Sequence, residues 1–282
     1  MARRGTLRRW IVLLLTLAMV VGGIYTAFAF VQRSEVLITE RCTAAGGTAE
    51  LATDQAANAG LITAVAVRRG LPARAASIAL ATAMQESKIR NINHGDQAGP
   101  DSRGLFQQRP SQGWGTAEQV IDPYHASNAF YDALVKIPGY ETLEITDAAQ
   151  RVQRSAYPHA YAQHEVMARS FASSLTGQTP AGLDCSLRAP DEAGDPAAVQ
   201  ERLSAAFGGV PASLDGSTLV LDTQGTRAWA MAQWAVANAK ALSITEVHAD
   251  GRSWTRQDRN GWQPSDVPAG QVRITVADAP AQ

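Results

Sequence analysis

Residues 10–31 form a run without a charged side chain, and this run constrains the chain more than any other feature of its sequence. A helix needs about 20 apolar residues to cross the hydrocarbon core of a bilayer. Four arginines, at positions 3, 4, 8 and 9, precede the run and favour a cytoplasmic N-terminus. The sequence therefore predicts a single-pass protein of the cell membrane. Residues 1–33 would hold a cytoplasmic arginine cluster and a transmembrane helix, and the C-terminal domains would be extracellular.

A removable signal peptide is the alternative interpretation of this segment, because Ala27-Phe28-Ala29 offers a small-x-small cleavage site. The apolar run exceeds the usual signal core of about 7 to 15 residues, which favours retention. Both interpretations export the rest of the chain.

Export determines the expected redox state of the only two cysteines, Cys42 and Cys185. Paired thiols tend to oxidise outside the cytoplasm, so we expect one disulfide between them. Such a bond would restrict the unfolded chain between its two ends. Two free buried thiols are the alternative.

Length and charge narrow the class of protein. The chain has 282 residues, of which 45% are hydrophobic, enough for two folded units. The formal net charge is −1, whereas nucleic-acid binding requires clustered positive charge. Nucleic acid is therefore not an expected partner.

Shifts in composition set the expected domain boundaries. Alanine-rich helical periodicity dominates the centre of the chain, and a Gly, Pro, Asp and Ser-rich stretch follows it. The expected units are a stalk at 34–58, a mainly helical domain at 59–176, a linker at 177–214, a small α+β domain at 215–277 and a tail at 278–282. In the α+β domain we expect a helix at 226–242 and strands at 244–248, 252–255 and 272–276.

Glu86 lies near the end of a helix expected at residues 73–88, with Pro72 suited to its start. Helical spacing places Ser77 and Ala81 on a polar face and Glu86 on the opposite, alanine-lined face. Burial disfavours the charged carboxylate, so the pKa of such a group rises and it keeps its proton near neutral pH. A protonated carboxyl can assist glycosidic cleavage by donating to the leaving oxygen. A buried Glu that pairs with an arginine or caps a helix is the alternative.

The surrounding residues add a resemblance. Ala83-Met84-Gln85-Glu86-Ser87, a polar loop and then Ser102-Arg103-Gly104-Leu105-Phe106-Gln107 resemble the "E-S, loop, S-x-G-L-x-Q" pattern of soluble-lytic-transglycosylase-like enzymes in the lysozyme superfamily. Asp122-Pro123 and the helix that follows resemble a later motif of the same family. The similarity covers roughly residues 59–171 and points to a cell-wall enzyme of the membrane-anchored actinobacterial type. It implies a mainly α lysozyme-like domain, preceded here by the transmembrane helix and followed by the small α+β domain.

The resemblance assigns roles to individual residues. It implies that Glu86 is the catalytic acid and base, that Ser102 and Gln107 bind substrate, and that the substrate is the MurNAc-GlcNAc glycan strand of peptidoglycan. A loop-stabilising amide is the alternative role for Gln107. No cofactor is implied. The family's "Y-N-A-G" motif is absent, and Tyr157 and Tyr161 in the equivalent place are the candidates for an aromatic that lines the cleft, or for simple packing.

The sequence places no second carboxylate clearly as a nucleophile, although Asp96 and Asp101 lie in the loop. In the family a single acid implies help from the substrate's own N-acetyl group and a 1,6-anhydro product, hence a lytic transglycosylase. An Asp101 that positions water would make the enzyme a hydrolysing muramidase. A non-catalytic wall-binding or assembly protein is a third possibility, and Glu86 argues against it.

Three weaker signals complete the sequence. His159 and His164 do not have zinc-site spacing, so no metal is expected. Trp114 suits either stacking on a sugar or anchoring of its loop. The segment from Trp229 to Trp254 resembles the tail of a domain distantly similar to zinc D-Ala-D-Ala peptidases. It lacks that domain's metal-binding half, which implies a non-catalytic role.

Overall fold

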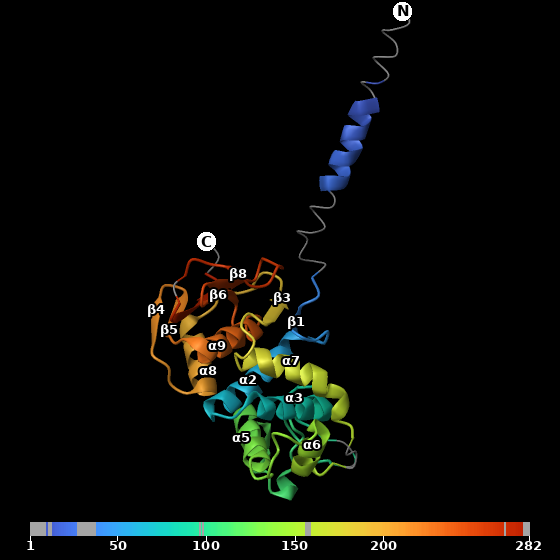
Figure 1. Cartoon of the computed structure of the whole chain (residues 1–282), viewed down its shortest axis with the longest axis vertical. Helices are drawn as coiled ribbons and strands as arrows, with labels where there is room; N and C mark the ends of the chain where they lie inside the picture. The colour runs from blue at the N-terminus through green and yellow to red at the C-terminus, as the bar shows by residue number, and fades with distance from the viewer. Residues whose placement is uncertain are drawn as a thin grey trace, which may run out of the picture. The chain divides into compact units, whose positions relative to one another are not determined.

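The computed structural model describes Trp10, residues 13–26, 38–95, Gln97, and residues 99–155, 159–267 and 269–278. The chain divides into two compact units, Met1–Thr39 and Glu40–Gln282 (Figure 1). All the helices and strands that carry candidate site residues belong to the second unit.

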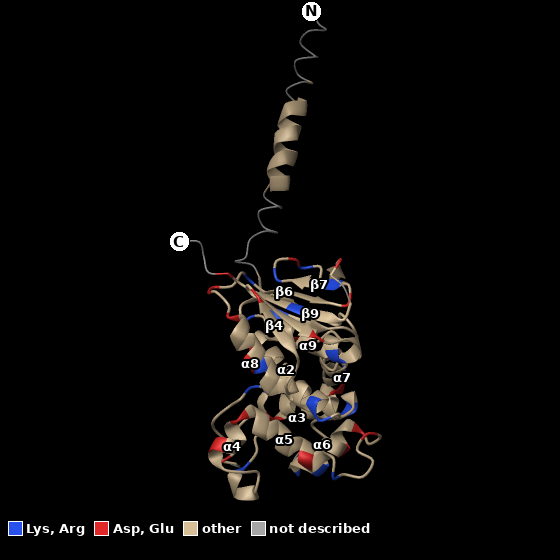
Figure 2. Ribbon diagram, turned by 90° about the vertical axis from the view of Figure 1, so that its left-hand side faces the viewer, with Lys and Arg blue, Asp and Glu red and all other residues tan. Residues whose placement is uncertain are grey.

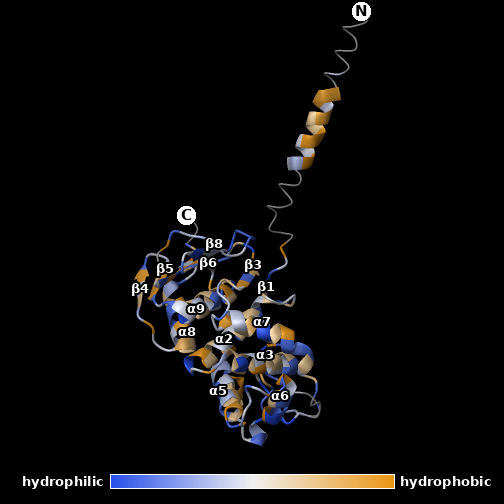
Figure 3. Ribbon diagram, viewed as in Figure 1, coloured by the Kyte–Doolittle hydropathy of each residue, from blue (hydrophilic) through white to orange (hydrophobic). Residues whose placement is uncertain are grey.

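In the N-terminal unit, residues 13–26 are helical and largely apolar (Figure 3). Among the described residues, no helix has both the length and the apolar character to cross a membrane. This finding corrects the prediction of a transmembrane helix and, with it, the single-pass membrane localisation with extracellular C-terminal domains. The arginine cluster and the possible cleavage site lie outside the described residues.

Eight α-helices and two short 3-10 helices occur in the described part of the second unit. They are α2 (Thr53–Arg68), α3 (Ala73–Ser87), η2 (Pro110–Gln112), α4 (Ala117–Ile121), α5 (Pro123–Leu134), α6 (Ile145–Gln153), η3 (Ala162–His164), α7 (Glu165–Leu175), α8 (Pro196–Phe207) and α9 (Gly225–Ala237).

The starts of several helices follow from local chemistry. The Asp122 carboxylate accepts the His125 amide at 2.7 Å, and Pro123 occupies the first turn of α5. Asp195 and Pro196 start α8 in the same way. The helix expected at residues 73–88 is confirmed as α3, which packs against α2, α5, α6 and α7.

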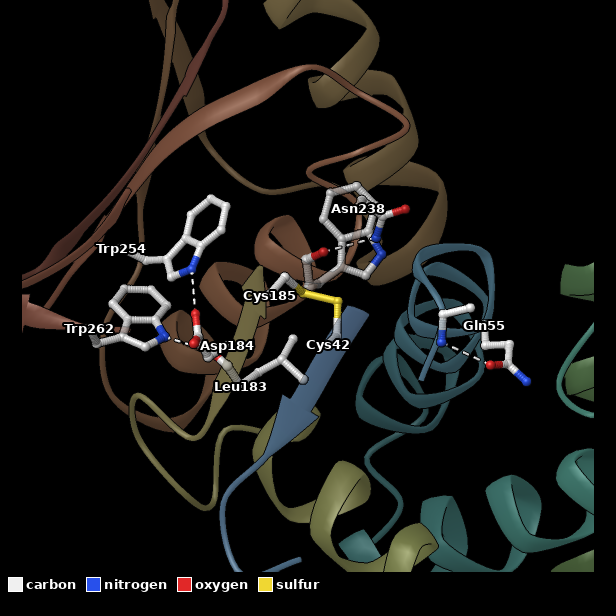
Figure 4. Close-up of a disulfide and its surroundings, with 10 residues drawn as sticks. Cys42, Gln55, Leu183, Asp184, Cys185, Asn238, Trp254 and Trp262 are labelled. Carbon is white, nitrogen blue, oxygen red and sulfur yellow. Dashed lines mark hydrogen bonds between the residues drawn. A yellow bond between two sulfur atoms is a disulfide. The ribbon is translucent and has the colours of Figure 1, made fainter. Parts of the chain in front are cut away.

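A three-stranded antiparallel sheet joins the two ends of the helical region. It consists of β1 (Arg41–Ala44), β2 (Glu50–Leu51) and β3 (Leu183–Ser186), in the order β2-β1-β3. Cys42 and Cys185 are paired across β1 and β3, and a disulfide connects them (Figure 4). The predicted disulfide is confirmed. Residues 41–44 and 50–51, expected in a stalk, are thus part of the folded unit.

A second, six-stranded antiparallel sheet occupies the C-terminal part. It consists of β4 (Ala212–Asp215), β5 (Thr218–Asp222), β6 (Ile244–Ala249), β7 (Arg252–Thr255), β8 (Gln263–Pro264) and β9 (Gln271–Val276), in the order β4-β5-β9-β6-β7-β8. The expected strands at 244–248, 252–255 and 272–276 are confirmed as β6, β7 and β9. The expected helix corresponds to α9. Asp250 and Gly251 have positive φ angles of 48° and 72°, which suit the tight turn between β6 and β7.

The two sheets make the chain a mixed α/β protein, so the expectation of a mainly α fold is corrected. Among the strands that were not expected, β1 lies in the expected stalk, β3 in the expected linker and β5 in the expected α+β domain. Their pairing partners are distant in sequence: β1 pairs with β3, and β5 pairs with β9. Short strands gain most of their stability from such partners, so local composition did not reveal them.

Helix α9 links the helical region to the six-stranded sheet, because it packs against α2 and α7 as well as β6 and β9. A Cβ atom at Gly60 of α2 would lie 3.3 Å from the Trp234 ring, so the glycine permits this close approach. The regions expected as a catalytic domain and an accessory domain thus share one hydrophobic core. Acidic and basic residues are interspersed along the helices, strands and loops of this second unit (Figure 2).

Candidate active site

Helix α3, which carries Glu86, is enclosed on all sides. Every residue from Ala75 to Ala83 is buried. Ser77 and Ala81, expected on a polar face, are 4% and 0% exposed, so that expectation is wrong. Ser77 satisfies its hydroxyl within its own helix by donating to the Ala73 carbonyl at 3.0 Å, which permits its burial. The small alanine side chains of α3 therefore allow the neighbouring helices to pack closely against the helix that carries Glu86.

Glu86 lies in the last turn of α3 and is half-buried. The Tyr161 hydroxyl donates a hydrogen bond to its Oε1 atom at 2.7 Å. Burial raises the pKa of the Glu86 carboxyl, and hydrogen bonds from Tyr161 and Gln153 oppose this rise without cancelling it. Among the residues that the structure describes, no arginine forms an ion pair with Glu86, and Glu86 caps no helix. The described residues therefore do not show the alternative, in which Glu86 pairs with an arginine or caps a helix.

The end of α3 is tied to the loop that carries the second half of the sequence motif. Lys88 adopts a left-handed conformation (φ 56°) and ends the helix. The Ser87 hydroxyl lies 2.7 Å from the Leu105 carbonyl oxygen, to which it donates. Arg103 and Gln108 close the loop through two backbone hydrogen bonds of 3.0 Å. The loop of residues 103–108, the motif turn, therefore has a fixed position beside Glu86.

Within the motif turn, Gly104 and Gln107 stabilise the backbone. Gly104 has φ 79°, and a Cβ atom there would lie 2.1 Å from the Val120 carbonyl oxygen. Its close approach is to α4, and no ligand is needed to explain it. Gln107 Nε2 donates to the Gly104 carbonyl at 3.2 Å, and Ser102 is 9% exposed. Substrate binding by Ser102 and Gln107 stays a prediction, and the observed bond of Gln107 is that of a loop-stabilising amide.

Gln153, the last residue of α6, is a site residue that the sequence reasoning missed. Its Nε2 atom donates to the Phe106 carbonyl at 2.8 Å, and its side chain also hydrogen-bonds the Glu86 carboxyl. It therefore connects the acid to the motif turn. The available signal was its position, because Gln153 lies in the same segment of the sequence as Tyr157 and Tyr161, in which only the tyrosines were considered.

Tyr161 is fully buried, and its ring packs in the core beside η3. Burial, followed by the charge of Glu86, raises the pKa of its hydroxyl, so Tyr161 stays protonated and acts as a permanent donor. Its role is therefore directed at the carboxyl, whereas contact with a sugar stays a prediction. Tyr157 lies outside the described residues.

Asp101 is held in an ion pair. Its Oδ1 atom accepts Arg109 Nε at 2.8 Å, and its Oδ2 atom accepts the Ser111 amide at 3.0 Å. Hydrogen bonds from Ser111, then the Arg109 guanidinium, hold the pKa of the Asp101 carboxyl well below its usual range. Asp101 is thus a loop-closing carboxylate. Asp96, the other acidic residue of the loop, lies outside the described residues.

The histidines and Trp114 take different positions. His164 Nε2 lies 3.0 Å from Gln85 Oε1, and burial lowers the pKa of the His164 ring. His159 is exposed. Trp114 is partly buried, and with Gln153 it lines a cavity of about 570 Å³.

Comparison of the chain with known protein families and with curated proteins found no match.

Proposed function

We propose that the protein is a lytic transglycosylase that cleaves the MurNAc-GlcNAc linkage of peptidoglycan glycan strands, with Glu86 as its catalytic acid and base. One observation carries the proposal. A half-buried carboxyl, with its pKa raised by burial, is fixed beside the motif turn by Tyr161 and Gln153. The two halves of the sequence motif thus lie next to each other, at a carboxyl whose raised pKa favours the protonated form that donation requires.

In the first step Glu86 donates its proton to the glycosidic oxygen as the bond from the MurNAc anomeric carbon to that oxygen breaks. The sugar alkoxide is a poor leaving group, and protonation makes it a neutral hydroxyl. The substrate's N-acetyl oxygen forms a bond to the anomeric carbon in its place. The new Glu86 carboxylate is stabilised by the Tyr161 hydroxyl at 2.7 Å, which favours the transfer.

In the second step the Glu86 carboxylate removes the proton from the MurNAc 6-hydroxyl. That oxygen then attacks the anomeric carbon, and the bond to the N-acetyl oxygen breaks. The product is a 1,6-anhydromuramoyl end, and Glu86 has regained its proton. One carboxyl group is sufficient for both steps.

Hydrolysis is the competing outcome, and it requires a group that positions a water molecule. Asp101, the described carboxylate in the loop, has its oxygens engaged by Arg109 and the Ser111 amide. Its lowered pKa also makes it a weak base. These contacts favour the anhydro product over hydrolysis.

The decisive experiment incubates the purified chain with peptidoglycan and identifies the released fragments by mass spectrometry. We expect fragments with anhydro ends, each lighter by one water molecule than a hydrolytic product. Glu86→Gln keeps the shape and the Tyr161 hydrogen bond but removes the proton. It should reduce release by about 10²-fold to 10⁴-fold.

Glu192→Gln is the matched control, because Glu192 is exposed and makes no ion pair with a described residue. It should leave release unchanged. Reducing ends in place of anhydro ends would identify a muramidase. Binding of peptidoglycan without release by the unaltered chain would identify a non-catalytic binding protein and overturn the proposal.

A further inference from the structure

The cavity of about 570 Å³ adjoins the proposed catalytic group through a shared residue. Gln153 lines this cavity, and its amide also hydrogen-bonds the Glu86 carboxyl and the Phe106 carbonyl. The cavity therefore begins one side chain away from the acid. The Gln153 side chain thus separates the cavity from the Glu86 carboxyl.

Three cations line this cavity, and none of the described residues that line it is acidic. Lys136, Arg151 and Arg154 are all exposed. Their side chains form no hydrogen bond or ion pair with another described residue. Asp132, one helical turn before Lys136, is paired instead with Arg69 at 2.6 Å. Three positive charges around one cavity, none paired with a described acidic residue, create a field that attracts an anion.

Trp114 adds an apolar wall to the cavity. Aromatic faces provide contact area for the carbon face of a sugar ring, while the cations would lie beside its substituents. Carboxylates match the forked geometry of arginine, which binds them through two parallel hydrogen bonds. The wall and the charges together fit a sugar that carries a carboxylate-bearing side group.

We infer that this cavity binds the carboxylate-bearing substituent on the 3-oxygen of a muramoyl residue, through Lys136, Arg151 and Arg154, and this inference rests on the function proposed above. The muramoyl sugar carries such a substituent and its GlcNAc neighbour does not, so the cavity sets the register of the strand over Glu86. The carboxylate has two possible sources. One is the peptide attached to the lactyl group, and the other is the free lactyl group of a strand without peptide.

The test measures binding by the full-length Glu86→Gln chain, which cannot cut the strand during a titration. Calorimetry compares peptide-bearing strands, peptide-free strands with free lactyl groups, and peptide-bearing strands whose carboxylates are converted to methylamides. Substituting all three cations by glutamine should weaken binding of the carboxylate strands by roughly tenfold, from exposed ion pairs added together. Binding of the amidated strands should stay within about twofold. The weakened class, peptide-bearing or peptide-free, identifies the source of the carboxylate.

Arg202, Arg252 and Arg259 supply a matched control, because they are exposed and form no ion pair with a described residue. Their triple glutamine variant should bind every strand as the parent does. Equal binding of carboxylate and amidated strands by the parent would overturn the inference, as would equal weakening of both classes by the cavity variant.

The experiments give one result if only this inference fails and another if the proposed function also fails. With Glu86 present, release of anhydro fragments from amidated and carboxylate strands at equal rates would retain the function and reject the cavity's role. Absence of both binding and release on every strand would reject both.

Discussion

Helices α3 and α9 are two alanine-rich helices of the same core, and each carries one amide or carboxyl side chain toward the interior. In α9 that residue is Gln233, which is 0% exposed. Its Oε1 atom accepts the Gly182 and Leu183 amides at 2.8 and 2.7 Å. Its Nε2 atom donates to the Ser174 and Thr179 carbonyls at 2.7 and 3.1 Å. All four of its hydrogen-bonding positions are occupied by backbone.

Glu86 in α3 has a different environment. A carboxylate has about four acceptor positions, and Glu86 is half-buried with hydrogen bonds from Tyr161 and Gln153. It lies at the end of its helix, one side chain from a cavity, whereas Gln233 lies inside a closed core. A saturated polar group stabilises the fold, and a polar group with spare capacity next to a cavity is available for chemistry. The contrast supports the catalytic role that we propose for Glu86 and a structural role for Gln233.

The largest effect on stability should follow from Gln233→Leu. This change leaves two amides and two carbonyls in the core without their partner, and each unsatisfied group costs about 1 to 3 kcal/mol. We expect a loss of roughly 4 kcal/mol in the free energy of unfolding, measured by urea denaturation. Gln257→Leu, at an exposed position, is the control and should change stability by less than about 0.5 kcal/mol. A loss below about 1 kcal/mol at Gln233 would mean that its network is dispensable.

The second prediction separates this network from the disulfide, since both hold the segment around β3. Replacing Cys42 and Cys185 together by serine removes a cross-link between residues separated by 143 positions. The unfolded chain gains freedom, so we expect a loss of about 2 to 4 kcal/mol. Denaturation of the oxidised chain with and without reductant gives the same quantity independently. Agreement between the two is expected, and a stable reduced chain would show that the segment is held without the disulfide, by Gln233 and the other contacts of β3.

The sequence was sufficient for features set by local pattern. Glu86 on an alanine-lined helix, the helix α9, and strands β6, β7 and β9 all follow from spacing and turn residues. The disulfide follows from there being only two cysteines. These features need no knowledge of a distant partner.

The other features depend on partners that the sequence does not reveal. Gln153 reaches Phe106, 47 residues away, and Gln233 reaches Leu183, 50 residues away. Burial of Ser77 depends on the helices that surround α3. The transmembrane prediction counted the apolar residues from 10 to 31, whereas among the described residues no helix is long and apolar enough to cross a membrane. Long-range packing thus decided what the local pattern left open.

The third prediction concerns the bond that distinguishes Glu86 from a simple buried acid. Tyr161→Phe removes a donor that stabilises the carboxylate formed as the proton leaves. The rate should fall roughly tenfold, equivalent to ~1.4 kcal/mol of transition-state stabilisation. The pKa of Glu86 should rise further, so the limb of the pH–rate profile where the acid loses its proton should move to higher pH. Tyr140→Phe is the control, and an unmoved limb in Tyr161→Phe would contradict the assigned role.

The smallest effect should be a gain in stability from Glu86→Gln, opposite in sign to the loss at Gln233. Burial raises the pKa of Glu86 above its ordinary value of 4.5, so the folded chain binds more protons than the unfolded chain just above that pH. Stability from this group is therefore present below about pH 4.5 and is lost as pH rises through the folded pKa. Glutamine has no charge to bury, so the variant should exceed the parent by roughly 0.5 to 1 kcal/mol near pH 7 and by less near pH 4. Urea denaturation at both pH values measures this, with Glu192→Gln as the control. If Glu86→Gln is less stable than the parent at neutral pH, Glu86 stabilises the fold, as Gln233 does.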